Sequence, residues 1–371
     1  MASDYILSLF ARFWFGILIF MFNFTENLNH IINMRIKRSL IAALSLLFMV
    51  LPMSAQDGNL VNIGLQARVD YQREYLDGSS VKDNCGFKGK NVSILIGGEF
   101  NEHFSYNYRQ RLYRGHGSES FFNATDFLYL TYKPDEHWSF SGGKQILEVG
   151  GYEYDLAPID IYFLSEYCSN IACYQMGVNA GYSFDGGKDL LRFQLCQSPF
   201  RQENSDMYAY NLMWNGSHGC FDSIWSVNMI EYLPGKFINY LALGNHFALG
   251  KFTVFADFMN RSLADRMSFL RDFTLIGKVA YSFCDRLNVF GKASFDYNDL
   301  DEAGDWCVMP GTSMGRVGCG VEYFPLADKS IRLHATFCHS FGDNGNPAGA
   351  LLADQQIASV GLTWRMSLLK R

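Results

Sequence analysis

Beyond residue 55 the chain lacks any apolar run that approaches the roughly 20 residues needed to cross a membrane as a helix. It also lacks an excess of positive charge. The first 55 residues hold four of the 31 basic and two of the 37 acidic side chains, so 27 basic and 35 acidic side chains remain after them, a net charge near −8. This balance argues against a nucleic-acid partner. If this part of the chain lies in a membrane, it must cross as strands.

Metal-binding and disulfide patterns are missing as well. The nine cysteines are odd in number and form no C-x-x-C pair, so they provide neither metal-ligand spacing nor a clear disulfide framework. We expect most of them to be small wall residues. Cys168 and Cys173, which flank one end of a loop, are the one pair to test for a bridge. No cofactor is expected.

The start of the chain contains a targeting signal. Met34 is followed by a short basic stretch, an apolar run and Met53-Ser54-Ala55, the order of a secretory signal peptide with cleavage after Ala55. Residues 1–33 contain another apolar stretch, which is either a membrane helix or a mis-assigned extension upstream of the true start at Met34. We favour the extension, because a complete signal peptide would serve no purpose behind an anchor. The predicted plan is therefore 1–33 extension, 34–55 signal peptide and 56–371 folded domain.

Alternation of apolar and polar residues is the main structural signal. Residues 61–75 place apolar side chains at nearly every second position, which predicts a strand with one apolar and one polar face. At about 15 residues this strand is much longer than a typical globular strand. In an outer-membrane barrel the apolar face contacts lipid and the polar face lines a wet lumen.

Similar stretches recur along the chain and are separated by two kinds of connection. Seven short turns alternate with eight longer loops, including one expected at 233–238, which predicts sixteen strands with both ends on the periplasmic side. Several middle strands, such as 126–133 and 222–232, are apolar on both faces, so their orientation stays open. The predicted fold class is all-β: a 16-stranded antiparallel transmembrane β-barrel. A soluble all-β protein with an aromatic core is the alternative.

The third long loop differs from the others. Residues 146–170 carry five acidic side chains and no Lys or Arg, and Pro158 suits the first turn of a single short helix with Ile159, Tyr162 and Phe163 on its apolar side. Such an apolar loop is expected to fold into the barrel and narrow the lumen. An outer loop packed against its neighbours or against a trimer partner is the alternative. The acidic residues are Glu148, Glu153, Asp155, Asp160 and Glu166.

The segment GGKQILEVGGYEYDLAPIDIYFLSEY, followed by ACYQMGVNAGYSF, resembles the phosphate-selective porin O and P family as found in Bacteroides-type bacteria, most closely over residues 138–184. The resemblance implies a sixteen-stranded, trimeric outer-membrane channel whose third loop lines the constriction. In phosphate-specific members arginines and lysines line the pore, whereas this third loop is acidic, so the resemblance alone does not assign phosphate as the solute.

Wall charges provide the candidate selectivity residues. Basic residues at the alternate strand positions that face away from lipid are assigned to the lumen wall. For each of them, a side chain that is simply solvated, or that extends to the membrane interface, is nearly as good an interpretation. A basic wall facing the acidic loop would set a transverse field that sorts passively diffusing solutes. The partners expected are small hydrophilic solutes or inorganic anions and outer-membrane lipid. The assigned basic residues are Arg68, Arg109, Arg111, Arg192, Lys278, Lys292, Arg332 and Arg365.

Two other function classes stay open. A barrel hydrolase could use Ser313, His334 and His339, but no nucleophile motif surrounds them. A structural or adhesive barrel would have a lumen filled by side chains. An energised transporter is disfavoured, because only about five residues separate the cleavage site from the first strand, which leaves no room for a plug.

Overall fold

A computed structural model describes residues 60–113, 121–201, 206–302 and 304–370. The proposed extension (1–33) and signal peptide (34–55) lie outside these residues. No helix in the described part of the chain is long and apolar enough to span a membrane. The described strands form one antiparallel sheet of sixteen long strands and the two-residue strand β2 (Ser79–Ser80) in the first loop, so the predicted count is confirmed. The long strands are β1 (Asn62–Leu76), β3 (Gly86–Glu99), β4 (Phe104–Arg111), β5 (Thr125–Tyr132), β6 (Trp138–Ile146), β7 (Tyr174–Phe184), β8 (Asp189–Gln197), β9 (Tyr208–His218), β10 (Phe221–Leu233), β11 (Lys236–Leu249), β12 (Phe252–Leu263), β13 (Asp272–Cys284), β14 (Leu287–Asn298), β15 (Thr312–Tyr323), β16 (Ile331–Asp343) and β17 (Gln355–Lys370).

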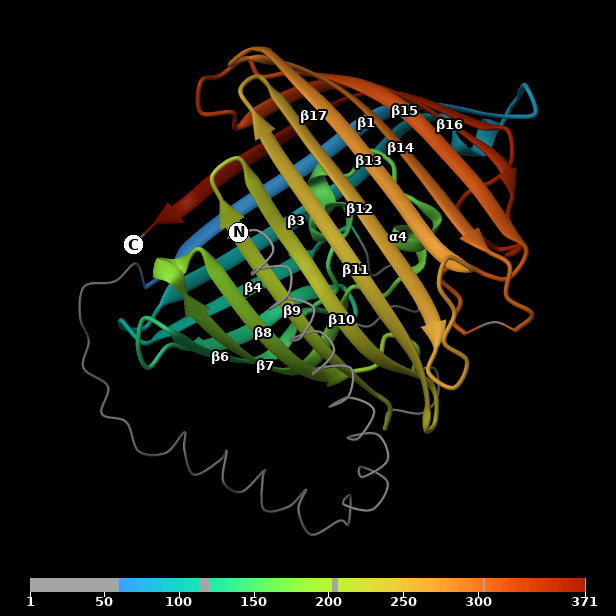
Figure 1. Ribbon diagram of the computed structural model, residues 1–371. Coiled ribbons are helices and arrows are strands. Elements are labelled where there is room, and N and C mark those ends of the chain that lie inside the picture. Colours follow the sequence, from blue (N-terminus) through green and yellow to red (C-terminus); the bar gives the residue numbers. More distant parts are fainter. Residues whose placement is uncertain (1–59, 114–120, 202–205, 303, 371) are drawn as a thin grey trace, which may run out of the picture. The chain divides into compact units, whose positions relative to one another are not determined.

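The sheet closes on itself. The last strand, β17, pairs along its length with β1, which also pairs with β3, and Figure 1 shows the red and blue strands side by side. The register places Arg365 opposite Gln66, so the first and last strands share one sector of the wall as expected. Closure removes the unpaired sheet edges that lipid could not satisfy.

The two faces of the sheet are inverted relative to a soluble protein. On β1, Val69 and Tyr71 are 41% and 43% exposed, whereas Arg68 and Asp70 are 2% and 1% exposed. Because the polar residues face the inside of a closed sheet, the exposed apolar side chains form its outer surface. The arrangement inferred from the alternation in residues 61–75 is confirmed.

One predicted loop is wrong. Instead of a longer loop at 233–238, β10 ends at Leu233 and β11 begins at Lys236, so only Pro234 and Gly235 connect them. Gly235 has a φ of +71°, which a two-residue turn needs and which glycine adopts without steric cost. The strands therefore extend further than their sequence pattern indicates.

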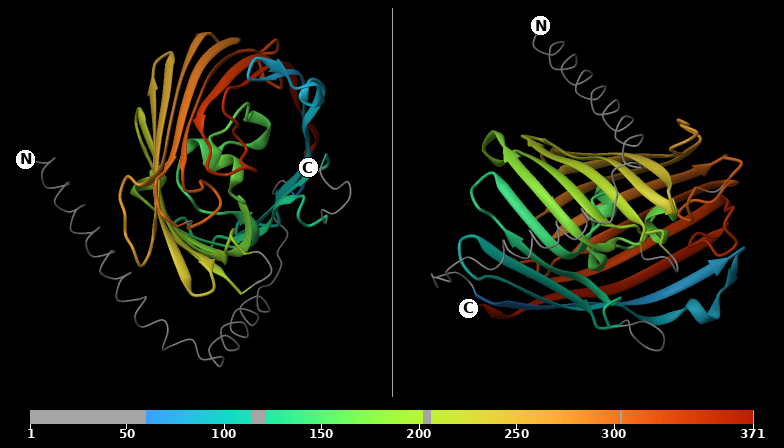
Figure 2. Two further views of the ribbon diagram at one scale, coloured as in Figure 1. Left: turned by 90° about the vertical axis from the view of Figure 1, so that its right-hand side faces the viewer. Right: turned by 90° about the horizontal axis from the view of Figure 1, so that it is seen from below.

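The third long loop, residues 147–173, lies inside the ring of strands, where Figure 2 (left) shows its green segments. We call it the inner loop. The single helix expected around Pro158 is replaced by three short elements: α3 (Tyr152–Asp155), the 3-10 turn η2 (Pro158–Asp160) and α4 (Glu166–Asn170). Tyr162 and Phe163 lie outside all three. The loop breaks at these points because the wall holds its pieces separately, as described below.

The inner loop explains the strands that are apolar on both faces. On β10, Ile230 is fully buried on the inward side and belongs to an apolar cluster with Leu147 and Val149 of the loop and Ile238 and Tyr240 of β11. Inward positions here contact protein rather than water. The alternation of apolar and polar residues is lost on β10 because an apolar core, like that of a soluble protein, lies between β10 and the inner loop.

Candidate functional site: the lumen and its inner loop

The inner loop enters the lumen against the backbone of β10 and β11. The backbone N–H of Gly150 donates to Ser226 Oγ at 2.8 Å. A Cβ on Gly150 would lie 2.5 Å from the carbonyl oxygen of Ile224, and a Cβ on Gly244 would lie 2.8 Å from Gly151 Cα. Both distances are shorter than real side chains allow, so loop and wall approach this closely only because glycine stands on each side.

A wall carboxylate binds the start of α3. Asp257 of β12 accepts hydrogen bonds from the backbone N–H groups of Tyr152 (2.9 Å) and Glu153 (2.8 Å). The N-cap residue of α3, Gly151, offers no side-chain acceptor. Asp257 of the wall therefore caps the N-terminus of α3, a role that the residue before a helix usually fills.

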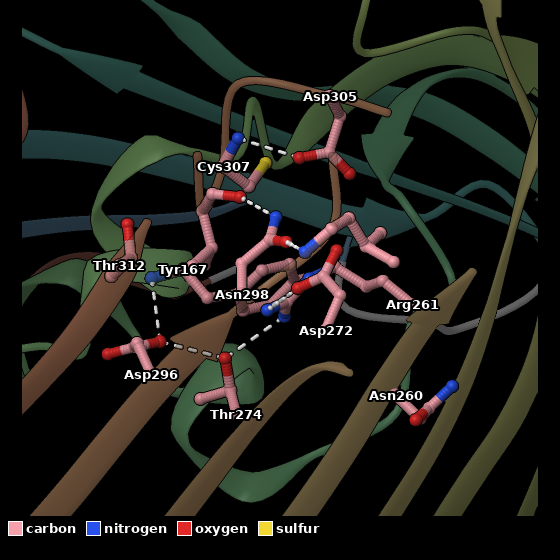
Figure 3. Close-up of polar contacts among 12 residues, drawn as sticks. Tyr167, Asn260, Arg261, Asp272, Thr274, Asp296, Asn298, Asp305, Cys307 and Thr312 are labelled. Carbon is pink, nitrogen blue, oxygen red and sulfur yellow. Dashed lines mark hydrogen bonds and ion pairs between the residues drawn. The ribbon is translucent and has the colours of Figure 1, made fainter. Parts of the chain in front are cut away.

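A second wall carboxylate binds the start of α4. Asp296 of β14 accepts hydrogen bonds from the N–H groups of Glu166 (2.9 Å) and Tyr167 (3.2 Å) and from Thr274 Oγ1 (2.7 Å). Figure 3 shows Thr274 linking Asp296 to Arg261, which forms an ion pair with Asp272. All of these wall side chains are buried, and their contacts with one another fix the position of the Asp296 carboxylate.

Arginines hold the tip of the loop. Asp160 of η2 pairs with both Arg332 (2.8 Å) and Arg365 (2.6 Å). Arg332 also donates to the carbonyl of Ile159 (3.1 Å), and Arg68 donates to the carbonyl of Ile161 (2.5 Å). The tip thus lies against the seam where β16, β17 and β1 meet.

Two further acids of the inner loop, Glu153 and Glu166, also bind other parts of the barrel. Glu153 is buried and forms an ion pair with Lys292, which donates to the carbonyl of Phe163 at 2.6 Å. Glu166, fully buried, accepts from the backbone N–H groups of Ala350 and Leu351 at 3.2 and 2.8 Å and so joins the inner loop to the last extracellular loop.

All eight basic residues assigned from the sequence lie on inward positions of their strands. Most of them do not face a free acidic loop across water but form direct ion pairs. Arg68 pairs with Asp70, and Lys278 lies over the Phe290 ring at 4.7 Å. Contacts to Asp126, Glu148, Glu153 and Asp160 account for the others: Arg109, Arg111, Arg192, Lys292, Arg332 and Arg365. Their role in conduction stays a prediction.

Of the five loop acids, Asp155 alone is exposed, and no ion pair to it is found among the described residues. Glu148 is buried and lies 3.3 Å from Arg192. Burial raises the pKa of Glu148, and the Arg192 charge partly offsets this rise.

The wall from β4 to β8 has a surplus of positive charge. Arg109 and Arg111 share the single carboxylate of Asp126, and Arg192 pairs with Glu148. Arg201, just beyond β8, donates to Gln175 and to the carbonyl of Ser198 (3.0 Å), and no ion pair to it is found among the residues that the structure describes. Four guanidinium groups therefore share two carboxylates on this side of the lumen.

Sequence reasoning missed the residues that position the loop. Asp257, Asp296, Ser226 and Arg316 all occupy inward positions, and Arg316 donates to the carbonyl of Leu164 at 3.1 Å. Polar residues at alternate positions of a predicted strand were the available signal. It identified the face but could not identify partners that lie between 76 and 152 residues away in the chain.

The residues considered for catalysis do not come together. His334 faces inward and its Nε2 lies 3.0 Å from Asp70 Oδ1. His339 and Ser313 occupy outward positions of β16 and β15, on the opposite side of the sheet. No nucleophile lies beside the His334–Asp70 pair in the contacts of the described chain.

A closed sixteen-strand barrel with an apolar exterior and an inward loop is the architecture of an outer-membrane porin, and that is the class of this protein. The model of the family "Phosphate-selective porin O and P" matches residues 61–219, which include the segment 138–184. Over these residues the chain is similar to this family, and it is an integral outer-membrane channel for passive diffusion of small hydrophilic solutes.

Solved structures agree on the fold. The anion-selective porin from Comamonas acidovorans has a TM-score of 0.58 at 9% identity, covering 82% of this chain and 99% of that one. The outer membrane channel DcaP of Acinetobacter baumannii scores 0.57 at 14% identity (85% and 100% covered), and OmpT of Vibrio cholerae scores 0.56 at 12% identity (85% and 100% covered). None of the curated proteins compared with the chain matches it. At these identities the likeness concerns the fold alone.

Proposed function

We propose that this porin prefers anions among the small hydrophilic solutes that it passes. The observation that carries the proposal is the charge surplus on the wall from β4 to β8, where four arginines share two carboxylates. Elsewhere in the described lumen wall, Arg68, Arg261, Lys292, Arg332 and Arg365 pair with acids, whereas Lys278 contacts an aromatic ring and Arg316 contacts neutral acceptors. Inorganic phosphate is one candidate solute, in keeping with the family name, and the porin from Comamonas acidovorans, described as anion-selective, has the same fold.

The physical basis is a field across a narrow aqueous path. Asp155 is exposed on α3 within electrostatic range of Arg192, so the loop and the wall bring opposite charges close to each other there. Low-dielectric walls strengthen such a field, and solutes are sorted by charge and dipole as they diffuse. Size selection comes from the inner loop, and no cofactor takes part.

Liposome swelling tests the passage itself. Proteoliposomes with the full chain are expected to swell in mono- and disaccharides at rates that fall steeply with sugar size, because the inner loop narrows the lumen. Swelling is also expected in phosphate. A barrel that produces no swelling in any solute, although it is fully assembled, would favour the structural or adhesive alternative.

Arg192→Gln combined with Arg201→Gln is expected to lower the anion-to-cation permeability ratio about two- to fivefold, because each removed charge contributes up to about 1 kcal/mol in water at contact distance. Reversal potentials in a salt gradient measure the ratio. Arg271→Gln is the matched control, since Arg271 is exposed and pairs with Asp299 outside the lumen. Equal reversal potentials in all three proteins would remove the charge preference.

The same proposal assigns no catalytic activity to the chain. It is supported by the separation of His334 from His339 and Ser313 on opposite faces of the sheet. A homotrimer is also proposed, supported by the family match and by the Vibrio cholerae OmpT structure described as a trimer form. Export through a signal peptide at residues 34–55, downstream of an extension at 1–33, completes the proposal and fits the outer-membrane location.

A further inference from the structure

The outer surface of the barrel carries a groove of about 650 Å³ across β14 to β17 and β1. Its floor is built from the small side chains of Ala335, Ala358 and Cys319. Exposed Tyr71 and Phe337 rise beside them. All of these residues occupy outward positions, so the groove faces lipid and not the lumen.

The groove slopes from one membrane face toward the other. Strand register joins Tyr71, Val360, Ala335, Val321 and Val289 in one row across five strands. Tyr71 lies nine residues after the periplasmic start of β1, whereas Val289 lies only two residues after the start of β14. A tilted strand rises roughly 2.3 Å per residue along the barrel axis, so the row descends roughly 16 Å, about one leaflet.

A basic residue stands at the upper end of the groove. Arg73 is exposed, lines the groove and faces outward beside Ala358. It lies eleven residues after Asn62, which places it roughly 25 Å up the wall, at the top of the apolar band of a barrel. No ion pair to Arg73 occurs within the described ranges of the chain. A lipid-facing cation at this height is best placed against the anionic headgroups of the outer leaflet.

The next row of the sheet adds polar groups above the groove. Tyr75, Gln356 and His339 are register partners across β1, β17 and β16, all on the outward face. The Nδ1 atom of His339 is buried and has no hydrogen-bond partner among the described residues. Within the described part of the chain, the upper end of the groove therefore combines a guanidinium group that contacts tyrosine hydroxyls but no acid with a histidine nitrogen that lacks a hydrogen-bond partner.

We propose that this groove binds one phosphorylated acyl lipid of the outer leaflet, with an acyl chain along Ala358, Ala335 and Val321 and the phosphate at Arg73. The length of the groove matches one leaflet, and the guanidinium complements a phosphate both in charge and in hydrogen-bond geometry. A second groove, of about 520 Å³ over β11 to β16, serves as an internal comparison, because no Lys or Arg lines it. A second copy of the chain fits the groove less well, because it would have to place a carboxylate beside Arg73 at this lipid-facing position.

The test uses the full chain in a non-ionic detergent, titrated with lipid A and read by native mass spectrometry. One tightly bound lipid A per chain is expected. Arg73→Gln and the groove-filling Ala358→Trp should each weaken its binding about five- to tenfold. Ala293→Trp, in the second groove, should not change it. Dephosphorylated lipid A should bind like Arg73→Gln, and inorganic phosphate should not displace lipid A, because the acyl chain contributes to binding.

Three outcomes would overturn the proposal. Equal lipid A binding by the wild type and both groove variants would show that lipid does not occupy the groove. Displacement by inorganic phosphate would identify a free-anion site. Loss of oligomers in Ala358→Trp, with lipid binding unchanged, would assign the groove to a second copy of the chain. Heat-modifiable migration on gels confirms that each variant has assembled as a barrel before it is compared.

Discussion

Replacing Asp257 and Asp296 together with alanine is expected to raise single-channel conductance at least about twofold and to admit larger solutes, because the inner loop leaves its position in the lumen. The change removes the acceptors for four backbone N–H groups, two at α3 and two at α4. Hydrogen bonds to a charged group contribute about 1.5–3 kcal/mol each. Helices of four and five residues have no stability of their own to replace them.

A steric variant tests the same docking by an independent route. Gly244→Leu leaves both carboxylates in place but introduces a side chain where a Cβ alone would lie 2.8 Å from Gly151 Cα. It should also raise conductance. Gly277→Leu is the matched control, because a Cβ on Gly277 has nothing within 4 Å. Unchanged conductance and size exclusion in both the double aspartate variant and Gly244→Leu, with barrels fully assembled, would show that the inner loop does not set the constriction.

The barrel could be predicted from the sequence because its cause is local. A strand in a bilayer must alternate, as residues 61–75 do, and the number of turn signals sets the number of strands. Where the inner loop replaces water, as on β10, the local pattern failed, since inward Ile230 contacts protein. The length of the turn at Pro234–Gly235 could not be predicted. When the flanking strand is apolar on both faces, the sequence pattern does not show where the strand ends, so a two-residue turn cannot be distinguished from a longer loop.

The docking of the inner loop could not be predicted because its cause is not local. The acidic character of residues 146–170 was visible, and an aqueous gap to a basic wall was expected from it. In the structure Asp160 and Glu153 bind wall cations directly, and Glu166 binds the last loop. The matching carboxylates of the wall, Asp257 and Asp296, lie 105 and 130 residues from the groups that they bind. Only closure of the barrel brings them together.

Those ion pairs imply that removing a loop acid should increase anion preference. Asp160 pairs with both Arg332 and Arg365, while Arg332 also lies 3.3 Å from Glu322; the Asp160 side chain is 29% exposed, so the site is in contact with lumen water. Asp160→Asn leaves two guanidinium groups with one unit less negative charge nearby. The anion-to-cation permeability ratio is expected to rise about fivefold, corresponding to about 1 kcal/mol for a unit charge near the path.

The measurement is the reversal potential in a salt gradient, at low and at high ionic strength, since screening should weaken the effect at high salt. Asp299→Asn makes the same change in charge on an exposed loop and should leave the ratio unchanged. The loop tip keeps the carbonyl contacts of Ile159 and Ile161 to Arg332 and Arg68, so the size limit should not move. If Asp160→Asn instead raised conductance without altering the permeability ratio, Asp160 would be a tether of the loop and the wall arginines would not set selectivity.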